Sequence, residues 1–258
     1  MSIQNKKKLN KLQMLLPEGA IVPSKWLQDK GYSRQLLYRY VKNKWLKSVG
    51  SGAYSRQTTE ITWQGLISSL QQVSGKTCHV GAETALNLQG FAHYLRLKGE
   101  KQIFIFTAST VPYWVKNVPL DGSLRFVRKR LFVNEQESIG LTEIPSPVKN
   151  WPLILSTPER AVMESLLFVK DTHSFTFAAE LMEGLTTLRP QIVNSLLKNC
   201  KHIGVKRLFM FLAEYYNHPW LGKTEKGSLD LGHGQRAVVT GGRLNKKYLI
   251  TVPEKFHD

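Results

Sequence analysis

Cations and tyrosines are concentrated in one short stretch of the chain, residues 32–56. These 25 residues include six Lys or Arg and four Tyr, and Gly-Ser-Gly at 50–52 interrupts the run. Guanidinium and ammonium groups bind phosphate oxygens, and Arg and Gln side chains also form paired hydrogen bonds with guanine and adenine. The stretch therefore has the chemistry needed to bind a nucleic acid.

The composition of the whole chain favours a polyanionic partner. The chain has 258 residues, 42% of them hydrophobic, and a formal net charge of +17. This hydrophobic content predicts a folded core, and the length allows two domains. Residues 1–60 carry twelve Lys or Arg and three Asp or Glu, which is about half of the net charge. Such an excess favours either nucleic acid or an anionic membrane surface.

The membrane alternative has little support in the sequence. No apolar run approaches the roughly 18 residues of a spanning helix. The basic residues 6–8 are followed by only a three-residue apolar run before Pro17, too short for a signal-peptide core. Cys78 and Cys200 lack a CxxC motif and partner histidines, so we expect two reduced, buried thiols. We expect a soluble, cytoplasmic protein with no membrane partner, no metal and no cofactor.

Hydrophobic spacing predicts the elements that position the cations. Leucines recur at helical spacing over residues 9–16, until Pro17 ends the pattern. After a short extended piece at 21–23, Ser24 is expected to cap a second helix that Gly31 ends. Ser33 is expected to cap a third helix, whose buried face contains Leu36, Leu37, Tyr40 and Val41.

The opposite face of the third helix is polar and cationic. Two helices joined by a tight glycine-containing turn are typical of a helix-turn-helix, whose second helix enters the major groove. We expect Arg34 and Gln35 to read base edges. Arg39 and Lys42 lie further along and are expected to meet phosphate.

Residues 46–56 predict a hairpin, because the glycines on both sides of Ser51 permit the positive φ of a tight turn. With cations on its arms, this hairpin is interpreted as the wing of a winged helix. The predicted DNA-binding set is Ser33, Arg34, Gln35, Tyr38, Arg39, Lys42, Lys47, Ser51, Tyr54 and Arg56. The alternative is a solvated basic face on a purely structural domain.

Residues 61–258 predict a second domain of mixed helices and strands, so the fold class is α+β with a winged helix-turn-helix at 1–60. Helices are expected at 61–74, 81–90, 157–169, 175–183, 190–200 and 204–217, and strands at 102–107, 124–133, 235–242 and 246–253. A second basic surface is expected from Lys206, Arg207, Arg243, Lys246 and Lys247. It would bind phosphate or an acidic partner; a solvated face is the alternative.

Several ordered blocks span nearly the full length of the chain. They are the predicted winged helix, "HVGAETALNLQGFAHYL", "STPERAVMESL", "LMEGLTTLRP", "VKRLFMFLAEYYNHPW" and "KKYLITVP". Together they resemble the AbiEi family of antitoxins from type IV toxin–antitoxin and phage-defence operons. The resemblance implies a winged helix that represses its own operon and a C-terminal domain that opposes a nucleotidyltransferase toxin, AbiEii. It also implies that antitoxin and toxin form no stable complex.

A nucleic-acid-processing enzyme, nuclease-like and targeted by the winged helix, is the alternative function. The sequence contains no HExxH, GxSxG or phosphate-loop motif and no clustered carboxylates, so no catalytic residue is expected. A single winged helix covers too few base pairs to select one operator. We therefore expect an inverted repeat, with possible self-association of the protein on DNA.

Overall fold

Two compact units make up the chain in a computed structural model, which describes residues 3–73, 78–91, 102–133, 139–225, 227 and 229–257. The first unit contains Met1–His79, Thr107–Phe126 and Glu143–Ile154; the second contains Val80–Phe106, Val127–Thr142 and Leu155–Asp258. Each unit therefore combines segments that are distant in the sequence. The boundary at residue 60 stays a prediction.

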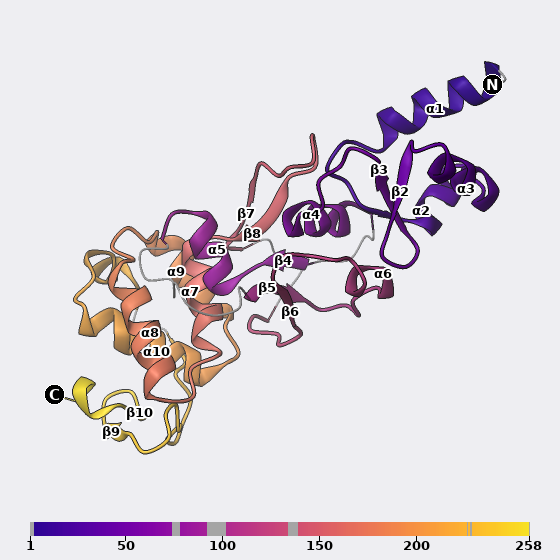
Figure 1. Ribbon diagram of the computed structural model, residues 1–258. Helices are drawn as coiled ribbons and strands as arrows, with labels where there is room; N and C mark the ends of the chain where they lie inside the picture. Colours follow the sequence, from indigo (N-terminus) through magenta and orange to yellow (C-terminus); the bar gives the residue numbers. More distant parts are fainter. Residues whose placement is uncertain are drawn as a thin grey trace. The chain divides into compact units, whose positions relative to one another are not determined.

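The N-terminal part of the first unit has the predicted order of helices and hairpin (Figure 1). It consists of α1 (Ile3–Leu15), β1 (Val22–Pro23), α2 (Ser24–Asp29), α3 (Arg34–Lys42), β2 (Leu46–Val49) and β3 (Ala53–Arg56). The three strands form an antiparallel sheet in the order β1-β3-β2. The expected cap at Ser24 is wrong. Pro23 occupies the N-cap position of α2, and the Ser24 hydroxyl instead accepts a hydrogen bond from Gln28.

The core of the first unit joins these helices to a later segment. Leu16, Leu27 and Leu37 are fully buried in one cluster that also includes Val148. The backbone at Gly19 has a φ of +85°, and a β-carbon there would lie 2.6 Å from the Pro147 carbonyl oxygen. Only glycine fits this close approach of two backbones without strain.

Helix α4 (Trp63–Val73), also in the first unit, confirms the helix predicted at 61–74, whose last residue lies outside the described residues. The Ser69 hydroxyl on this helix accepts a hydrogen bond from the Ile21 N–H at 2.9 Å. The short helix α6 (Tyr113–Lys116) belongs to the same unit. The sequence did not predict it.

A five-stranded sheet has the order β6-β5-β4-β8-β7, with β4 (Cys78–Val80), β5 (Gln102–Thr107), β6 (Ser123–Val127), β7 (Leu141–Ile144) and β8 (Leu153–Ser156). The strand predicted at 102–107 is confirmed. The strand predicted at 124–133 is too long, because β6 ends at Val127. Beyond it, Phe132 forms an isolated bridge with Cys200, and the Lys201 N–H donates to the Leu131 carbonyl at 2.8 Å.

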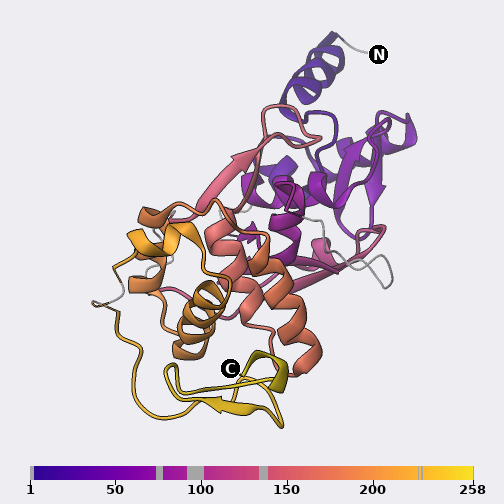
Figure 2. The ribbon, with the colours of Figure 1, turned by 90° about the vertical axis from the view of Figure 1, so that its left-hand side faces the viewer.

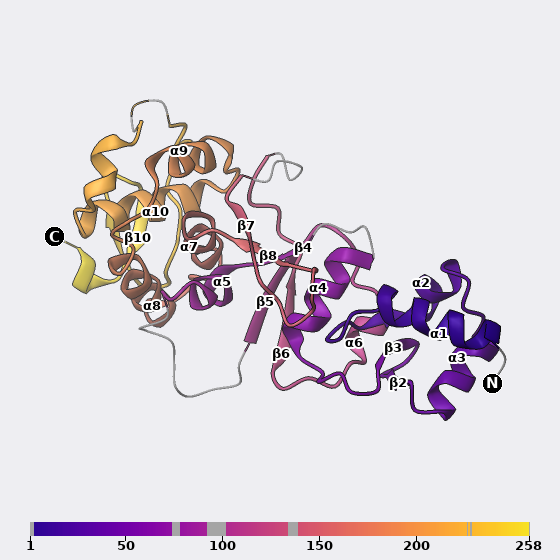
Figure 3. The same ribbon diagram turned by 90° about the horizontal axis from the view of Figure 1, so that it is seen from above.

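The second unit is built around α7 (Pro158–Leu166), which packs against α5 (Ala82–Leu88), α8 (Thr172–Glu183), α9 (Pro190–Asn199) and α10 (Ile203–Tyr215) (Figure 3). The helices predicted in this region are confirmed. Every residue of α7 after Pro158 is buried, including the charged Glu159, Arg160 and Glu164. Because α7 is buried on all sides, its charged side chains must find partners within the protein.

The C-terminal segment of the second unit contains little regular structure. It has the 3-10 helices η1 (Pro219–Lys223) and η3 (Glu254–Phe256) and a pair of antiparallel strands, β9 (Arg243–Asn245) and β10 (Ile250–Val252). Figure 2 shows this yellow segment looping beside the orange helices. The strand predicted at 235–242 is wrong: its pairing is a single bridge between Arg236 and Ile250.

Candidate nucleic-acid interface

Helix α3 starts at a side-chain cap and buries one face. The Ser33 hydroxyl accepts a hydrogen bond from the Leu36 N–H at 3.3 Å, which satisfies one of the free donors of the first turn. Leu36, Leu37 and Tyr40 are buried in the core of the first unit. The cap and the predicted apolar stripe are both confirmed, and together they fix which side of α3 faces outward.

The outward side of α3 carries the predicted contact residues. Arg34, Gln35, Tyr38, Arg39 and Lys42 are all exposed. Tyr38 keeps 70% of its surface accessible. Arg34 and Lys42 form no ion pair with any residue that the structure describes. The helix thus presents donors and an aromatic ring that the fold does not use.

The β2–β3 hairpin lies beside this helix and turns at two glycines. Its register pairs Leu46 with Arg56 and Val49 with Ala53. Gly50 and Gly52 have φ values of +59° and +81°, as the tight turn requires. Ser51 is exposed between them. The predicted hairpin is confirmed.

Three of the predicted wing residues are engaged within the first unit. The Lys47 ammonium donates to the Thr59 carbonyl at 2.5 Å, and the Arg56 guanidinium donates to the Gln13 carbonyl. Tyr54 is half-buried against the core cluster. Contact between these three side chains and DNA stays a prediction. Lys47 and Arg56 could bind phosphate only if they gave up their hydrogen bonds to the carbonyls of Thr59 and Gln13.

The second basic surface is only partly present, because Lys206 and Arg207 are buried, with 5% and 2% of their surface exposed. The Arg207 guanidinium donates to the carbonyls of Leu231, Gly232, Gly234 and Leu249 at 2.6–3.2 Å. Lys206 donates to the Asp230 carbonyl at 3.0 Å. The prediction that these two residues belong to a surface is therefore wrong.

The other three members of that predicted surface are exposed. Arg243 pairs with Glu254, and the Lys247 ammonium lies 2.5 Å from the Glu214 carboxylate. Lys246, which precedes Lys247 in the sequence, is also exposed. Two of the three cations are thus partly neutralised by a neighbouring carboxylate, which weakens their attraction for phosphate.

Two buried tyrosines stabilise the base of the candidate interface. The Tyr32 hydroxyl donates to the Lys8 carbonyl at 3.1 Å and so joins α1 to the start of α3. Burial raises the pKa of Tyr32, and the neighbouring Tyr40 acts in the same direction. Burial also raises the pKa of Tyr40, against the opposing effect of Arg39. Both rings therefore stay neutral at physiological pH. Of the four tyrosines in residues 32–56, Tyr32 and Tyr40 thus serve packing, Tyr54 is half-buried and Tyr38 is exposed.

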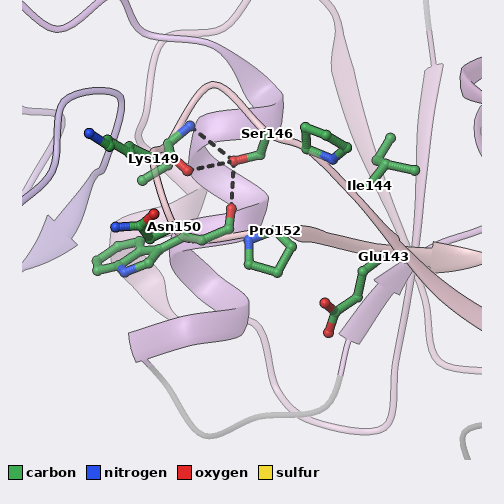
Figure 4. A pocket seen from close by; sticks show the side chains of 9 residues that line it. Glu143, Ile144, Ser146, Lys149, Asn150 and Pro152 are labelled. Atoms are coloured by element: carbon green, nitrogen blue, oxygen red, sulfur yellow. Dashed lines mark hydrogen bonds between the residues drawn. The ribbon is translucent and has the colours of Figure 1, made fainter.

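A shallow pocket of about 480 Å³ lies along residues 143–152 in the first unit (Figure 4). The Ser146 hydroxyl accepts a hydrogen bond from the Val148 N–H at 2.9 Å and donates to the Trp151 carbonyl at 2.6 Å. Trp151 in turn packs edge-on against Trp26 of α2, with ring centroids 6.3 Å apart. None of the predicted site residues lines this pocket. The hydrogen bonds of Ser146 stabilise the turn of this segment, and Trp151 packs the segment against α2.

Comparisons with known proteins define the class of this chain. A model of the N-terminal domain of the AbiEi antitoxin transcriptional regulator matches residues 5–97, and a model described as "Transcriptional regulator, AbiEi antitoxin, Type IV TA system" matches residues 100–253. The chain is therefore a transcriptional regulator of a type IV toxin–antitoxin system. It belongs to the AbiEi antitoxin family, which confirms the resemblance seen in the sequence.

Similarity to a solved structure supports the fold. The crystal structure of the RV2827C protein from Mycobacterium tuberculosis is 12% identical in sequence, with a TM-score of 0.53, and the match covers 98% of this chain and 92% of that one. No protein with a curated description matches the chain in sequence. Among the described residues, no helix is long and apolar enough to cross a membrane.

Proposed function

We propose that the chain represses the operon that encodes it, with α3 and the β2–β3 hairpin acting as a winged helix on operator DNA. The observation that carries this proposal is the exposed face of α3. Its five polar or cationic side chains lie opposite the buried residues Leu36, Leu37 and Tyr40, so the core fixes which side of the helix faces outward before any partner binds. Such preorganisation lowers the entropic cost of binding.

The position of each side chain suggests its role. Arg34 and Gln35 lie in the first turn of α3, where a recognition helix meets base edges. Lys42 ends the helix, where phosphate contacts fix the register without reading sequence. Ser51, exposed at the hairpin turn, is placed to reach the backbone or the minor groove.

The second part of the proposal concerns the toxin. The family is described as an antitoxin of type IV systems. We infer that this chain opposes a nucleotidyltransferase toxin through its C-terminal domain, residues 61–258, and that the two proteins form no stable complex. Arg34→Ala and Lys42→Ala, expressed from an unrelated promoter in cells that produce the toxin, should lose repression and retain protection. Loss of protection in both variants, with normal protein levels, would contradict this division of roles.

The DNA-binding proposal is tested by an electrophoretic shift on the chain's own promoter, with a scrambled duplex as the control. If about six phosphates are neutralised, affinity should fall roughly a thousandfold between about 50 and 200 mM salt. We expect an inverted repeat occupied by two or more copies, because one winged helix contacts too few base pairs for operator selection. Equal affinity for promoter and scrambled DNA at every salt concentration would refute operator recognition.

A further inference from the structure

The turn of the β2–β3 hairpin packs against a segment distant in sequence. A β-carbon added at Gly50 would overlap the carbonyl oxygen of Asn117, the residue that follows α6. The second glycine of the turn, Gly52, has no atom within 4 Å of such a β-carbon. One side of the turn therefore rests on the end of α6, and the other side is open. Figure 1 shows α6 next to this turn, and both belong to the first unit.

Helix α6 is firmly anchored although it is only one turn long. Trp114 and Val115 are buried, with 9% and 1% of their surface exposed. The Asn117 side-chain amide donates to the Tyr113 carbonyl at 2.9 Å and closes the turn. A backbone held in this way also fixes the direction of its two outward residues.

The outward residues of α6 are a tyrosine and a lysine. Tyr113 keeps 72% of its surface accessible, an exposure similar to that of Tyr38 on α3. Lys116 is exposed and forms no ion pair with any residue that the structure describes. A hydroxyl donor and a free ammonium beside the hairpin turn match the chemistry of a sugar-phosphate backbone.

We propose that Tyr113 and Lys116 continue the DNA-binding surface beyond the wing and contact the backbone of the same duplex. This inference rests on the proposed winged-helix function. Two observations select DNA as the occupant: the turn and α6 form one continuous surface through the Gly50–Asn117 contact, and the free cation matches a polyanion. Residues 113–117 would thereby hold the wing in place and lengthen its footprint.

The salt dependence of promoter binding tests the contact of Lys116. Lys116→Ala should weaken binding to the promoter and to a scrambled duplex alike, because a phosphate contact carries no sequence information. It should also lower the slope of log affinity against log salt by about 0.9, so that the ratio of wild-type to variant affinity changes about threefold between about 50 and 200 mM salt. The matched control is Lys170→Ala, which removes an exposed lysine of the second unit and should leave the slope unchanged.

The outcomes separate this inference from the function on which it rests. A slope for Lys116→Ala equal to that of wild type and of Lys170→Ala, with wild type binding the promoter normally, would overturn the inference alone. A wild-type chain that does not distinguish its promoter from the scrambled duplex would overturn the proposed function as well.

A pair of glycine variants tests the continuity of the surface. Both Gly50→Ala and Gly52→Ala strain a residue with positive φ, but only Gly50→Ala pushes the turn away from Asn117. In a hydroxyl-radical footprint, Gly50→Ala should lose protection at the outer edge of each half-site, and Lys116→Ala should lose the same nucleotides. Gly52→Ala should keep them. Protection lost at different nucleotides in Gly50→Ala and Lys116→Ala would contradict one shared surface.

Discussion

The Arg160 guanidinium and the Glu164 carboxylate form a buried ion pair on α7, with 2.9 Å between Nε and Oε1. The second oxygen of Glu164 accepts from the Ser156 hydroxyl at 2.8 Å and from the Ala82 N–H at 3.1 Å. One carboxylate thereby joins α7 to the end of β8 and the start of α5. Because Glu164 is 1% exposed, water could not take the place of the carboxylate if it were removed. Each of these partners would then lose a hydrogen-bond acceptor in the interior of the protein.

We predict that Glu164→Ala destabilises the second unit by about 3–5 kcal/mol, because it leaves the Arg160 charge buried and unpaired. Glu183→Ala, an exposed glutamate of α8, should change the stability by less than about 0.5 kcal/mol. Urea denaturation followed by circular dichroism measures both. Equal midpoints for the two variants would show that the buried network contributes little.

Arg207 offers a test of its buried position. Arg207→Ala removes donors from four backbone carbonyls, so we expect a loss of more than about 2 kcal/mol and faster proteolysis of residues 231–249. Lys246→Ala, an exposed residue within that segment, should leave the rate of cleavage by a protease that does not cut at lysine unchanged. Similar cleavage rates in the two variants would mean that Arg207 does not hold this segment.

Mild acid should destabilise the second unit through two histidines. Burial lowers the pKa of His218, and burial together with the Lys129 charge lowers that of His202. The folded chain binds these protons at a lower pH than the unfolded chain, whose histidines titrate near the ordinary value of 6.5, so stability is complete above that pH and falls as the pH drops through it. The melting temperature should therefore fall between about pH 7.5 and 5.

The contribution of His218 can be isolated by substitution. His218 is 4% exposed, and this burial favours the neutral imidazole, whose Nε2 lies 2.8 Å from the Met182 carbonyl oxygen and donates to it. His218→Gln should lower the melting temperature at pH 7.5 but flatten its decrease toward pH 5. A pH profile parallel to that of wild type would assign the acid sensitivity to other groups.

Two glycines of the first unit separate backbone strain from steric overlap. Gly19 and Gly31 have φ values of +85° and +87°, but only at Gly19 does a β-carbon meet another backbone. Gly31→Ala should therefore cost only the strain of a left-handed residue, about 1–2 kcal/mol. Gly19→Ala must also displace the Pro147 backbone and should cost more, as thermal melts would show. Identical melting temperatures would contradict the packing of residues 143–154 on the N-terminal helices.

Local signals were sufficient to predict much of the candidate interface. The Ser33 cap, the apolar stripe of α3 and the glycine turn at 50–52 all depend on residues within a few positions of one another. The long apolar runs of α7, α10 and β5 were recognisable for the same reason. Periodicity within one segment is set by the geometry of helix and strand and needs no knowledge of the tertiary fold.

Features that depend on distant residues were not predictable. Arg207 is of a residue type usually found at the surface, and only its hydrogen bonds to the carbonyls of Leu231, Gly232, Gly234 and Leu249 explain its burial. The contact between Gly50 and Asn117 has no sequence signal. It joins the β2–β3 hairpin to the end of α6, a helix of four residues that is too short to show a periodic pattern. Strands of three or four residues, such as β4 and β8, are too short for a reliable alternation of apolar residues.

The central claim, that α3 reads the operator, is tested most directly by comparing Arg34→Ala with Lys42→Ala on promoter and scrambled DNA at one fixed salt concentration. Arg34→Ala should lose about 1–3 kcal/mol of binding on the promoter and much less on scrambled DNA, because a base contact exists only at the correct sequence. Lys42→Ala should weaken both duplexes equally. If Arg34→Ala instead loses the same affinity on both duplexes, α3 is not the recognition helix.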